Sequence, residues 1–503
     1  MLKYIDKFID HITMYHLLLY YLLVLLVAAT IFSAVGILGY NPLGIVIAAV
    51  YLVIICLVAN KIFAHVFHAP VNQLSAYLTA LILALIITPL AKPQGLEFLT
   101  AAAVIAMASK YILAIDKKHV FNPAAIAVVI TSFAVGQSAS WWVGTVPLLP
   151  FVIVGGVLLA RKLRRIQMVA IFLVVAVIMT MLISLLKGNG VLASLPMILD
   201  HSSLFFLGFV MLSEPLTTPP TRRGQSLYAL LAGLIFSPQI HIFSLYSTPE
   251  LTLVVSNVFS YIISPKRKLV LPLKQKNQLT PDITEFVFQP EQRLKYRAGQ
   301  YMEITLPHQH VDFRGTRRTF TLASSPTEDE VRFGLKFYPK GSSFKKAISM
   351  VTKTTPLAIG QLAGDFTLPK NPEAKLAFIA GGIGVTPYRS LVKYLLDSDD
   401  KREMTLMYSE RSASELVYRD VFDAAAKLPG KKIVYSVDEA PQDWRGQRGR
   451  ITADMIKAEI PDYRQRLFYV SGPLPMVNAT KQNLRALGVP RRRVITDYFP
   501  GYA

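Results

Sequence analysis

One segment in the second half of the chain combines three side chains that suit a phosphorylated, planar ligand. The sequence RRTFTLASSP at 317–326 places Arg318, Phe320 and Thr321 in a predicted strand. We expect the three to share one face of the strand, where they would offer a cation for phosphate, a ring for a flat heterocycle and a hydroxyl. A barrel strand with an exposed arginine is the alternative interpretation.

Two glycine-containing segments add candidate phosphate sites. Gly341, Ser342 and Ser343 open a predicted helix, whose N-terminal N–H groups bind anions. The segment 375–396 runs from an apolar strand through a glycine-rich turn, Gly381 to Pro387, into an amphipathic helix. Strand, turn and helix in this order indicate a pyrophosphate site, whereas the turn alone would indicate only tight packing.

The elements that must position these motifs predict two soluble domains. Short alternating segments over 268–370 predict an antiparallel β-barrel. Over 371–503, buried strands alternate with helical stretches, which predicts a doubly wound parallel α/β sheet. One late strand, FYVSGPLPMV at 468–477, ends in Ser-Gly-Pro.

In this order and spacing, the four motifs resemble the ferredoxin–NADP reductase superfamily over residues 268–503. The resemblance implies FAD in the barrel domain and NAD(P)H in the α/β domain. It places Arg318 at the FAD pyrophosphate, Phe320 against the isoalloxazine and Thr321 near its reactive nitrogen. The implied contacts to the FAD phosphates are Gly341, Ser342 and Ser343. The implied contacts to the NAD(P)H pyrophosphate are Gly382, Gly384, Thr386 and Pro387, and those near the nicotinamide are Ser471, Gly472 and Pro473.

Thr321 and Ser471 are the candidate catalytic residues of this resemblance. Ser471 stands where many members have cysteine, so the family role carries over only by size. The end of the chain would place Tyr498 or Phe499 near the flavin.

The choice between NADH and NADPH depends on the end of the second strand of the sheet. Ser409 and Arg411 follow that strand, and an arginine there can receive a 2′-phosphate. Glu410 lies between them, and a solvated arginine is the alternative. The sequence favours NADPH slightly and leaves NADH open.

The first 264 residues have the composition of a membrane domain. No Asp, Glu, Lys or Arg occurs between Asp10 and Lys61, a stretch that fits two spans of roughly 20 residues. The whole chain is 52% apolar and only 17% charged, and its one cysteine, Cys56, excludes a disulfide framework or a four-thiolate cluster made by this chain alone. The predicted spans are 15–36, 43–64, 74–91, 98–116, 121–137, 143–160, 167–186, 202–216, 226–244 and 250–264.

The net charge of +21 has a topological interpretation in this half. With ten spans, fourteen Lys and Arg residues fall on one side and two on the other, which places both termini and the soluble domains in the cytoplasm. We therefore expect a multi-pass protein of the inner membrane with lipid as its surroundings. Nucleic-acid binding is not expected, and no metal site is predicted.

Proline interrupts several of the spans. Broken helices are tolerated at membrane depth where they line a cavity or a cofactor, and kinked helices in a packed bundle are the alternative. Glu214 lies in such a break and is the main candidate for a cation, proton or cofactor contact, with Lys110 and Asp200 as the other charges inside spans.

Three segments of this half resemble the RnfD/NqrB family of flavin-bearing membrane subunits. They are VNQ at 71–73, SKYILAIDKKHVFNPAA at 109–125 and LSEPLTTPPTRRGQ at 212–225. The resemblance implies a ten-helix inverted repeat and an FMN site. The family's FMN-bearing threonine falls on Val146, with Thr145 one position early, so we expect a noncovalent FMN. The residues expected near such a membrane flavin are Trp141, Trp142, Thr145, Asn122 and Glu214, and an interfacial aromatic belt is the alternative for the tryptophans.

The sequence thus predicts a three-part protein, with a polytopic helical membrane domain over 1–264 followed by the barrel and the α/β domain. The leading hypothesis is an oxidoreductase that passes electrons from cytoplasmic NAD(P)H through FAD to a flavin, quinone or partner subunit at the membrane. A haem-type, ferric-reductase-like transmembrane reductase and a flavin-regulated transporter are the alternatives. The nine histidines form no facing pairs within the predicted spans, which disfavours haem. The terminal acceptor, ion pumping and the subunit count stay open.

Overall fold

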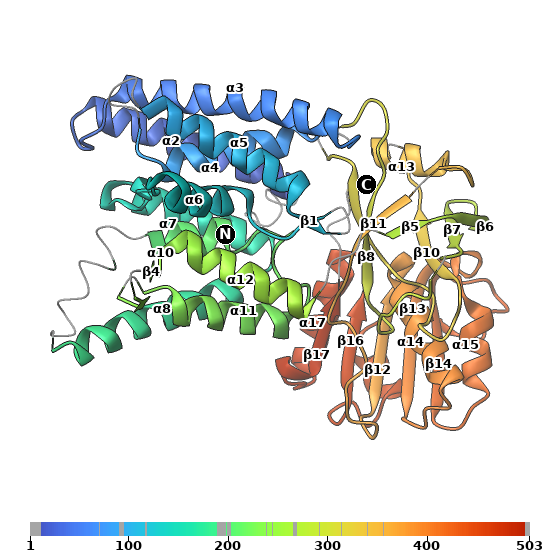
Figure 1. The fold of residues 1–503 in the computed structure, drawn as a ribbon. Coiled ribbons are helices and arrows are strands. Elements are labelled where there is room, and N and C mark those ends of the chain that lie inside the picture. Colours follow the sequence, from blue (N-terminus) through green and yellow to red (C-terminus); the bar gives the residue numbers. More distant parts are fainter. Residues whose placement is uncertain are drawn as a thin grey trace. The chain divides into compact units, whose positions relative to one another are not determined.

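The computed structural model divides into two compact units, Met1–Arg267 and Lys268–Ala503 (Figure 1). The described residues are 12–69, 71–89, 95–115, 118–188, 198, 203–237, 239–243, 245–264, 269–290, 292–312, 314–339, 341–355 and 357–497. Asp200, Tyr498 and Phe499, which the sequence singles out, lie outside them.

Helices form most of the first unit. Three of them, α2, α3 and α8, are long and apolar enough to cross a membrane by length and composition. The described helices are α2 (Met14–Ala34), α3 (Pro42–Val66), α4 (Gln73–Ile86), α5 (Leu96–Ile112), α6 (Pro123–Val135), α7 (Leu149–Lys162), α8 (Ile166–Leu186), α10 (Ser203–Phe206), α11 (Arg222–Ile235) and α12 (Pro249–Ile263). A π-helical turn, η5 (Leu207–Met211), continues α10, and the short strand pairs are β1 (Ala114–Ile115) with β2 (Lys118–His119) and β3 (His241–Ile242) with β4 (Leu245–Tyr246).

Several helices are shorter than the predicted spans because proline and glycine interrupt them. The span predicted at 74–91 stops at Ile86, shortly before Pro89. The one predicted at 143–160 begins as two 3-10 turns, η2 (Trp142–Gly144) and η3 (Val146–Leu148), before α7 starts. Other helices start sharply where a capping residue precedes proline, as Asn122 does at α6 by accepting from the N–H groups of Ala124 and Ala125.

The first part of the second unit consists of two antiparallel sheets around one core. The first sheet has the order β10 (Val331–Lys336), β7 (Ile283–Phe288), β6 (Leu273–Thr280). The second has the order β5 (Leu269–Leu271), β11 (Leu357–Ala363), β8 (Tyr301–Thr305), β9 (Arg317–Thr321). Alternating apolar side chains face inward, and the rings of Phe286, Phe288 and Phe333 stack in the core. A short helix, α13 (Ser343–Ser349), follows β10.

The rest of the second unit is a six-stranded parallel sheet with helices between the strands. Its order is β15 (Gln447–Arg448), β14 (Lys431–Glu439), β13 (Met404–Ser412), β12 (Leu376–Gly381), β16 (Leu467–Ser471), β17 (Val494–Asp497). The helices are α14 (Thr386–Asp397), α15 (Arg419–Ala426), α16 (Ala453–Glu459) and α17 (Leu474–Ala486), with single 3-10 turns η6 (Gly382–Val385), η7 (Ala413–Glu415) and η8 (Arg491–Arg493). Strand order reverses between β12 and β16, and ligands of such sheets bind outside the carboxyl ends of the strands at this point.

Candidate functional site

The predicted dinucleotide turn lies at the point where the sheet reverses. It connects β12 to α14, and the Ser471–Pro473 segment leaves the neighbouring strand β16 beside it. A Cβ added to Gly384 would lie 2.5 Å from the Cα of Gly472, so the two segments are in backbone contact. Gly382 differs, because its φ is +57° and a Cβ there would meet nothing within 4 Å. Gly382 leaves open space in front of the turn, whereas Gly384 lets the two turns meet.

The other predicted residues of this region have structural contacts of their own. The Thr386 hydroxyl donates to the carbonyl of Ile383 at 2.7 Å, and Pro387 occupies the first turn of α14. Ser471 is the buried last residue of β16, opposite Ala380 of β12. The structure therefore brings the NAD(P)H-binding candidates of both turns to one edge of the sheet.

Strand β9 corrects one expectation about the Arg-x-Phe-Thr motif. Side chains alternate along a strand, so Thr321 points away from the face that carries Arg318 and Phe320. The Phe320 ring stacks on Phe333 with centroids 4.8 Å apart, and the Arg318 guanidinium lies 5.2 Å from the centroid of Phe344. The cation and the ring thus remain together, and the buried hydroxyl of Thr321 belongs to the opposite face.

Basic groups crowd around the start of α13. Burial, followed by the charges of Arg314 and Arg318, lowers the pKa of Lys345 to about 8. The carboxylate of Asp312 accepts from the backbone N–H of Ser343 at 2.9 Å and from the Arg314 Nη2 at 2.9 Å. Asp312 occupies these donors, whereas the neighbouring cations Arg314, Arg318 and Lys345 fit the phosphates of FAD.

The three predicted phosphate residues differ in what they do. Ser342 caps α13 by accepting from the N–H of Lys345, and the Ser343 hydroxyl contacts the His308 ring at 3.0 Å. A Cβ at Gly341 would make only ordinary contacts of 3.4 Å or more. Asp312, Arg314 and His308 were missed by the sequence analysis, although their loop directly precedes the Arg-Arg-Thr-Phe-Thr strand.

The predicted ribose end contains an ion pair that the sequence did not show. Arg411 Nε lies 2.7 Å from the carboxylate of Glu439, and both side chains are exposed. Glu439 ends β14, which pairs in parallel with β13, so adjacent strand ends bring the two together. Ser409 lies on β13 between Gly381 and Ser436. An acid therefore stands beside the arginine that was expected to receive a 2′-phosphate.

Glu410 is buried between these residues and gives the fold a pH dependence. Burial raises the pKa of Glu410 from 4.5 to about 7, although the Tyr408 hydroxyl donates to it at 3.0 Å. Because the folded pKa is the higher one, the free energy of unfolding falls as pH rises from about 4.5 to 7 and is constant above. We expect Glu410→Gln to raise the free energy of unfolding by about 3 kcal/mol at pH 8 and by little at pH 4.5.

Thermal unfolding of both proteins at several pH values measures this difference. Glu439→Gln, at an exposed carboxylate of the same sheet edge, is the control and is expected to leave the pH profile unchanged. Parallel profiles for wild type and Glu410→Gln would contradict the assignment.

A partly buried polar cluster surrounds Glu214 in the first unit. The Asn122 amide donates to Glu214 Oε2 at 2.8 Å, and His119 Nε2 lies 3.7 Å from Glu214 Oε1. Asn257 accepts from the Asn122 N–H at 2.8 Å and donates to the Tyr228 hydroxyl at 3.0 Å. The structure thus brings two predicted residues, Asn122 and Glu214, into one network.

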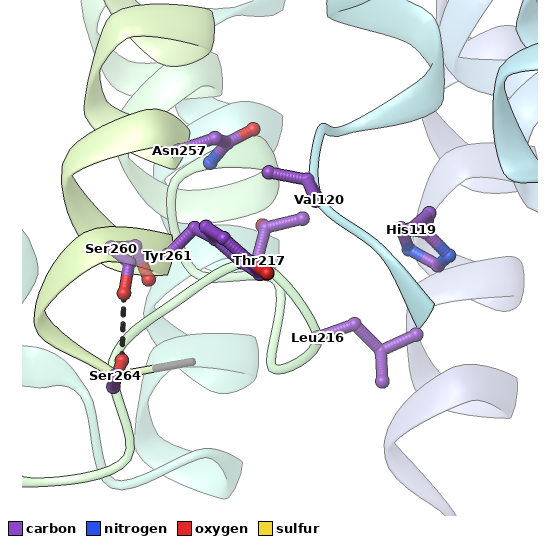
Figure 2. A pocket seen from close by; sticks show the side chains of 8 residues that line it. All are labelled: His119, Val120, Leu216, Thr217, Asn257, Ser260, Tyr261 and Ser264. Carbon is purple, nitrogen blue, oxygen red and sulfur yellow. Dashed lines mark hydrogen bonds between the residues drawn. The ribbon is translucent and has the colours of Figure 1, made fainter. Parts of the chain in front are cut away.

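A small cavity adjoins this cluster (Figure 2). It is lined by His119, Val120, Leu216, Thr217, Asn257, Ser260, Tyr261 and Ser264. Its free volume of about 10 Å³ corresponds to a single water molecule. The buried Thr217 hydroxyl has no hydrogen-bond partner among the described residues, which fits a water or ion of that size. A flavin ring does not fit this arrangement.

The tryptophan segment is held by a carboxylate that the sequence analysis overlooked. Trp141 Nε1 donates to buried Glu250 at 2.8 Å, and Trp142 Nε1 donates to the carbonyl of Ala84 at 3.0 Å. The Thr145 hydroxyl is buried with no hydrogen-bond partner in the described part of the chain. The Thr145 hydroxyl can therefore bond to a polar ligand, whereas the indole N–H of Trp142 already donates to a backbone carbonyl.

Comparison with known proteins concerns the second unit. Residues 378–482 match the model of the oxidoreductase NAD-binding domain. The chain is 25% identical over 218 residues to the glycine betaine monooxygenase reductase subunit of Chromohalobacter salexigens, covering 42% of this chain and 58% of that protein. It is 26% identical over 245 residues to NADH-cytochrome b5 reductase 1 of Meyerozyma guilliermondii, covering 47% and 84%. Among solved structures, the cytochrome b5 reductase domain of Ulva prolifera nitrate reductase has a TM-score of 0.42 at 23% identity, covering 46% and 97%.

These similarities support the expected class of the second unit. The second unit is similar to reductases of the ferredoxin–NADP reductase type, which supports FAD and NAD(P)H as its cofactors. The chain spans less than two thirds of the glycine betaine monooxygenase reductase subunits that it matches.

Proposed function

We propose that this protein is a membrane-bound flavoprotein oxidoreductase that carries electrons from cytoplasmic NAD(P)H through FAD to an acceptor at the first unit. The observation that carries the proposal is the pairing, within one compact unit, of the dinucleotide turn with the Arg318–Phe320 face and its surrounding cations. When bound, FAD supplies the change from two-electron hydride chemistry to single-electron transfer.

The residues of the second unit bind and orient FAD and NAD(P)H rather than react with them. Arg318 and Arg314 supply positive charge for the FAD phosphates, and Phe320 supplies an apolar ring beside them. The contact of Gly384 with Gly472 keeps the two NAD(P)H-binding turns in register. Ser471 adds a small side chain where the nicotinamide would lie.

Membrane insertion of the first unit is supported by the outer surfaces of its long helices. α2, α3 and α8 expose large apolar side chains, among them Val27, Ile54 and Ile178, each more than half exposed. Such a surface is stable only in lipid or against a partner. Together with the resemblance to RnfD/NqrB subunits and the excess of basic residues on one side, this supports a multi-pass inner-membrane protein with its reductase module in the cytoplasm.

The acceptor of the electrons is a membrane flavin, a quinone or a partner protein. The polar cluster at Glu214 does not fit a flavin, whereas the buried Thr145 hydroxyl leaves a membrane FMN as a candidate. Several matched relatives are named as reductase subunits, which favours a partner protein that receives the electrons.

One purification tests this proposal. The full chain, extracted from membranes with detergent, is expected to contain FAD identifiable by mass and to oxidise NAD(P)H with an artificial acceptor. A Soret band in its absorption spectrum would instead support the haem-type alternative. A protein without FAD, or one released from membranes by buffer alone, would overturn the corresponding part of the proposal.

We further propose that NADH is the preferred coenzyme. Glu439 neutralises Arg411 and would repel a 2′-phosphate, and an acid at a strand end suits a free ribose hydroxyl. Glu439→Gln is therefore expected to raise kcat/KM for NADPH about tenfold and to change that for NADH less. Steady-state kinetics with both coenzymes measure the ratio.

The exposed pair of Lys401 with Asp399, distant from the end of β14 in sequence, provides the control. Asp399→Asn removes a similar surface carboxylate and is expected to leave the coenzyme ratio unchanged. A wild-type preference for NADPH would show that the ion pair does not set the specificity.

A further inference from the structure

A second cavity of the first unit lies at the C-terminal end of α3. It is lined by Lys61, Ala64, His65, His68, Ala69 and Val71 and has a volume of about 440 Å³. None of these residues takes part in the proposed electron path. The cavity combines a basic lining with a position at the end of the most extended apolar helix described in this unit.

The end of α3 that carries the lining residues is held in place by contacts of its neighbouring residues. Asn60 is 2% exposed, accepts from the Tyr111 hydroxyl at 2.9 Å and donates to the carbonyl of Asn72 at 3.5 Å. The rings of Phe63 and Phe67 stack on Tyr111. The end of α3 is thereby attached to α5 and to the start of α4, so the lining residues keep their positions without a ligand.

The electrostatic surroundings of the cavity favour an anion. Lys61, His65 and His68 are exposed, and none has a side-chain hydrogen bond or ion pair with the residues that the structure describes. The 14-residue helix α4 begins two residues after Val71, so the positive end of its dipole lies beside the cavity. The Lys110 ammonium adds a charge one turn further on, where it donates to the carbonyl of Ser75 at 3.0 Å.

Negative groups are scarce in the same region. Within the described part of the first unit the carboxylates are those of Glu97, Glu214 and Glu250, and none of the three lines this cavity. Among the residues that the structure describes, no carboxylate therefore neutralises the basic groups of the cavity lining.

An apolar surface leads along α3 to the cavity. Five branched residues spaced four apart form a band that spans about 160° of the helix circumference. They are between 44% and 56% exposed: Val46, Val50, Ile54, Val58 and Ile62. At 100° per residue, Lys61 and His65 lie about 60° and 100° around the helix from Val46, which is within this band. The surface thus changes from an apolar stripe about 24 Å long to a basic cavity without a change of face.

We propose that this cavity binds the headgroup phosphate of an anionic phospholipid whose acyl chain lies along the α3 stripe. The proposal rests on the proposed membrane location of the first unit. The continuity of stripe and cavity assigns a lipid rather than free phosphate, which would make no use of the apolar residues. The basic end of α3 corresponds to the predicted cytoplasmic side, where anionic headgroups attract Lys and Arg.

The test uses the full chain in nanodiscs of phosphatidylcholine with and without phosphatidylglycerol. Native mass spectrometry counts the phosphatidylglycerol retained per protein after transfer to detergent. In the triple variant Lys61→Gln, His65→Gln, His68→Gln, the amount of retained phosphatidylglycerol is expected to fall at least about fivefold. A change of this size is expected from the loss of even one basic residue near an anionic headgroup. Arg223→Gln, at an exposed position in the first turn of α11, is the matched control and is expected to match the wild type.

Three results would overturn the proposal. These are unchanged retention in the triple variant, an equal loss in Arg223→Gln, and displacement of the bound lipid by millimolar inorganic phosphate with no preference between the two lipids. A chain that is recovered in buffer without detergent would instead refute the membrane location itself. Circular dichroism and gel filtration in detergent, measured on every sample, show that each variant is folded.

Discussion

Replacing Arg318 with glutamate is expected to yield a protein that retains membrane association but loses its FAD and its NAD(P)H oxidation. Arg318 belongs to a group of three cations, with Arg314 and Lys345, at the start of α13. Hydrogen bonds to charged groups contribute about 1.5–3 kcal/mol each, and reversing the charge adds repulsion to the loss. FAD affinity is expected to fall at least about 100-fold.

The same arginine also organises the loop that precedes it, which makes the choice of variants important. Its Nη1 donates to the carbonyls of Arg314 at 2.7 Å and Arg317 at 2.6 Å. Arg318→Lys keeps the charge, but an ammonium group lacks the several fixed N–H donors of a guanidinium. We therefore expect an intermediate, roughly tenfold, loss of FAD affinity. Arg293→Glu, an exposed arginine of the same domain, controls for the change of net charge.

FAD content per protein after gel filtration, and NAD(P)H oxidation with and without added FAD, measure the effect. Rescue of Arg318→Lys but not of Arg318→Glu by excess FAD is the expected pattern. Full flavin occupancy in Arg318→Glu would show that the pyrophosphate is bound elsewhere.

The architecture of the second unit follows from local patterns, and its site contacts do not. Alternation in short segments predicted the antiparallel sheets, and strand, turn and helix in order predicted the dinucleotide turn at β12. The placing of Thr321 with Arg318 was wrong because a strand reverses face at every residue. Asp312 meets Ser343 across 31 residues, a contact set by how the loop folds and by no spacing in the sequence.

The other differences between the sequence predictions and the structure have two causes. One is the pairing of strands, and the other is the position at which helices end. The contact of Arg411 with Glu439 exists because β13 and β14 run in parallel and end together, which requires their register to be known. In the first unit, hydropathy indicated apolar helices, but backbone breaks at Gly144 and Pro147 shortened them. Glu250 escaped notice since it follows Thr248 and Pro249 at a helix start, where an acid usually serves the helix dipole.

Replacing Gly384 with alanine is expected to reduce kcat/KM for NAD(P)H about 100-fold while FAD stays bound. The added Cβ would lie 2.5 Å from the Cα and 2.6 Å from the N of Gly472, and backbone atoms cannot rotate out of the way. Restoring an ordinary contact moves the two turns apart by about 1 Å, a displacement that can cost about 100-fold in rate. Because the residues proposed to bind FAD lie on other strands, FAD occupancy should hardly change.

Gly382→Ala is the matched control, since it lies two residues away in the same turn but lacks the clash. Its φ of +57° is unfavourable for alanine by about 1 kcal/mol, and its Cβ would meet open space. We therefore expect less than a tenfold loss in kcat/KM. Steady-state kinetics with FAD-saturated protein compare the two variants. If both lose activity equally, the turn's flexible backbone is what NAD(P)H binding requires, and the contact between Gly384 and Gly472 does not position the site.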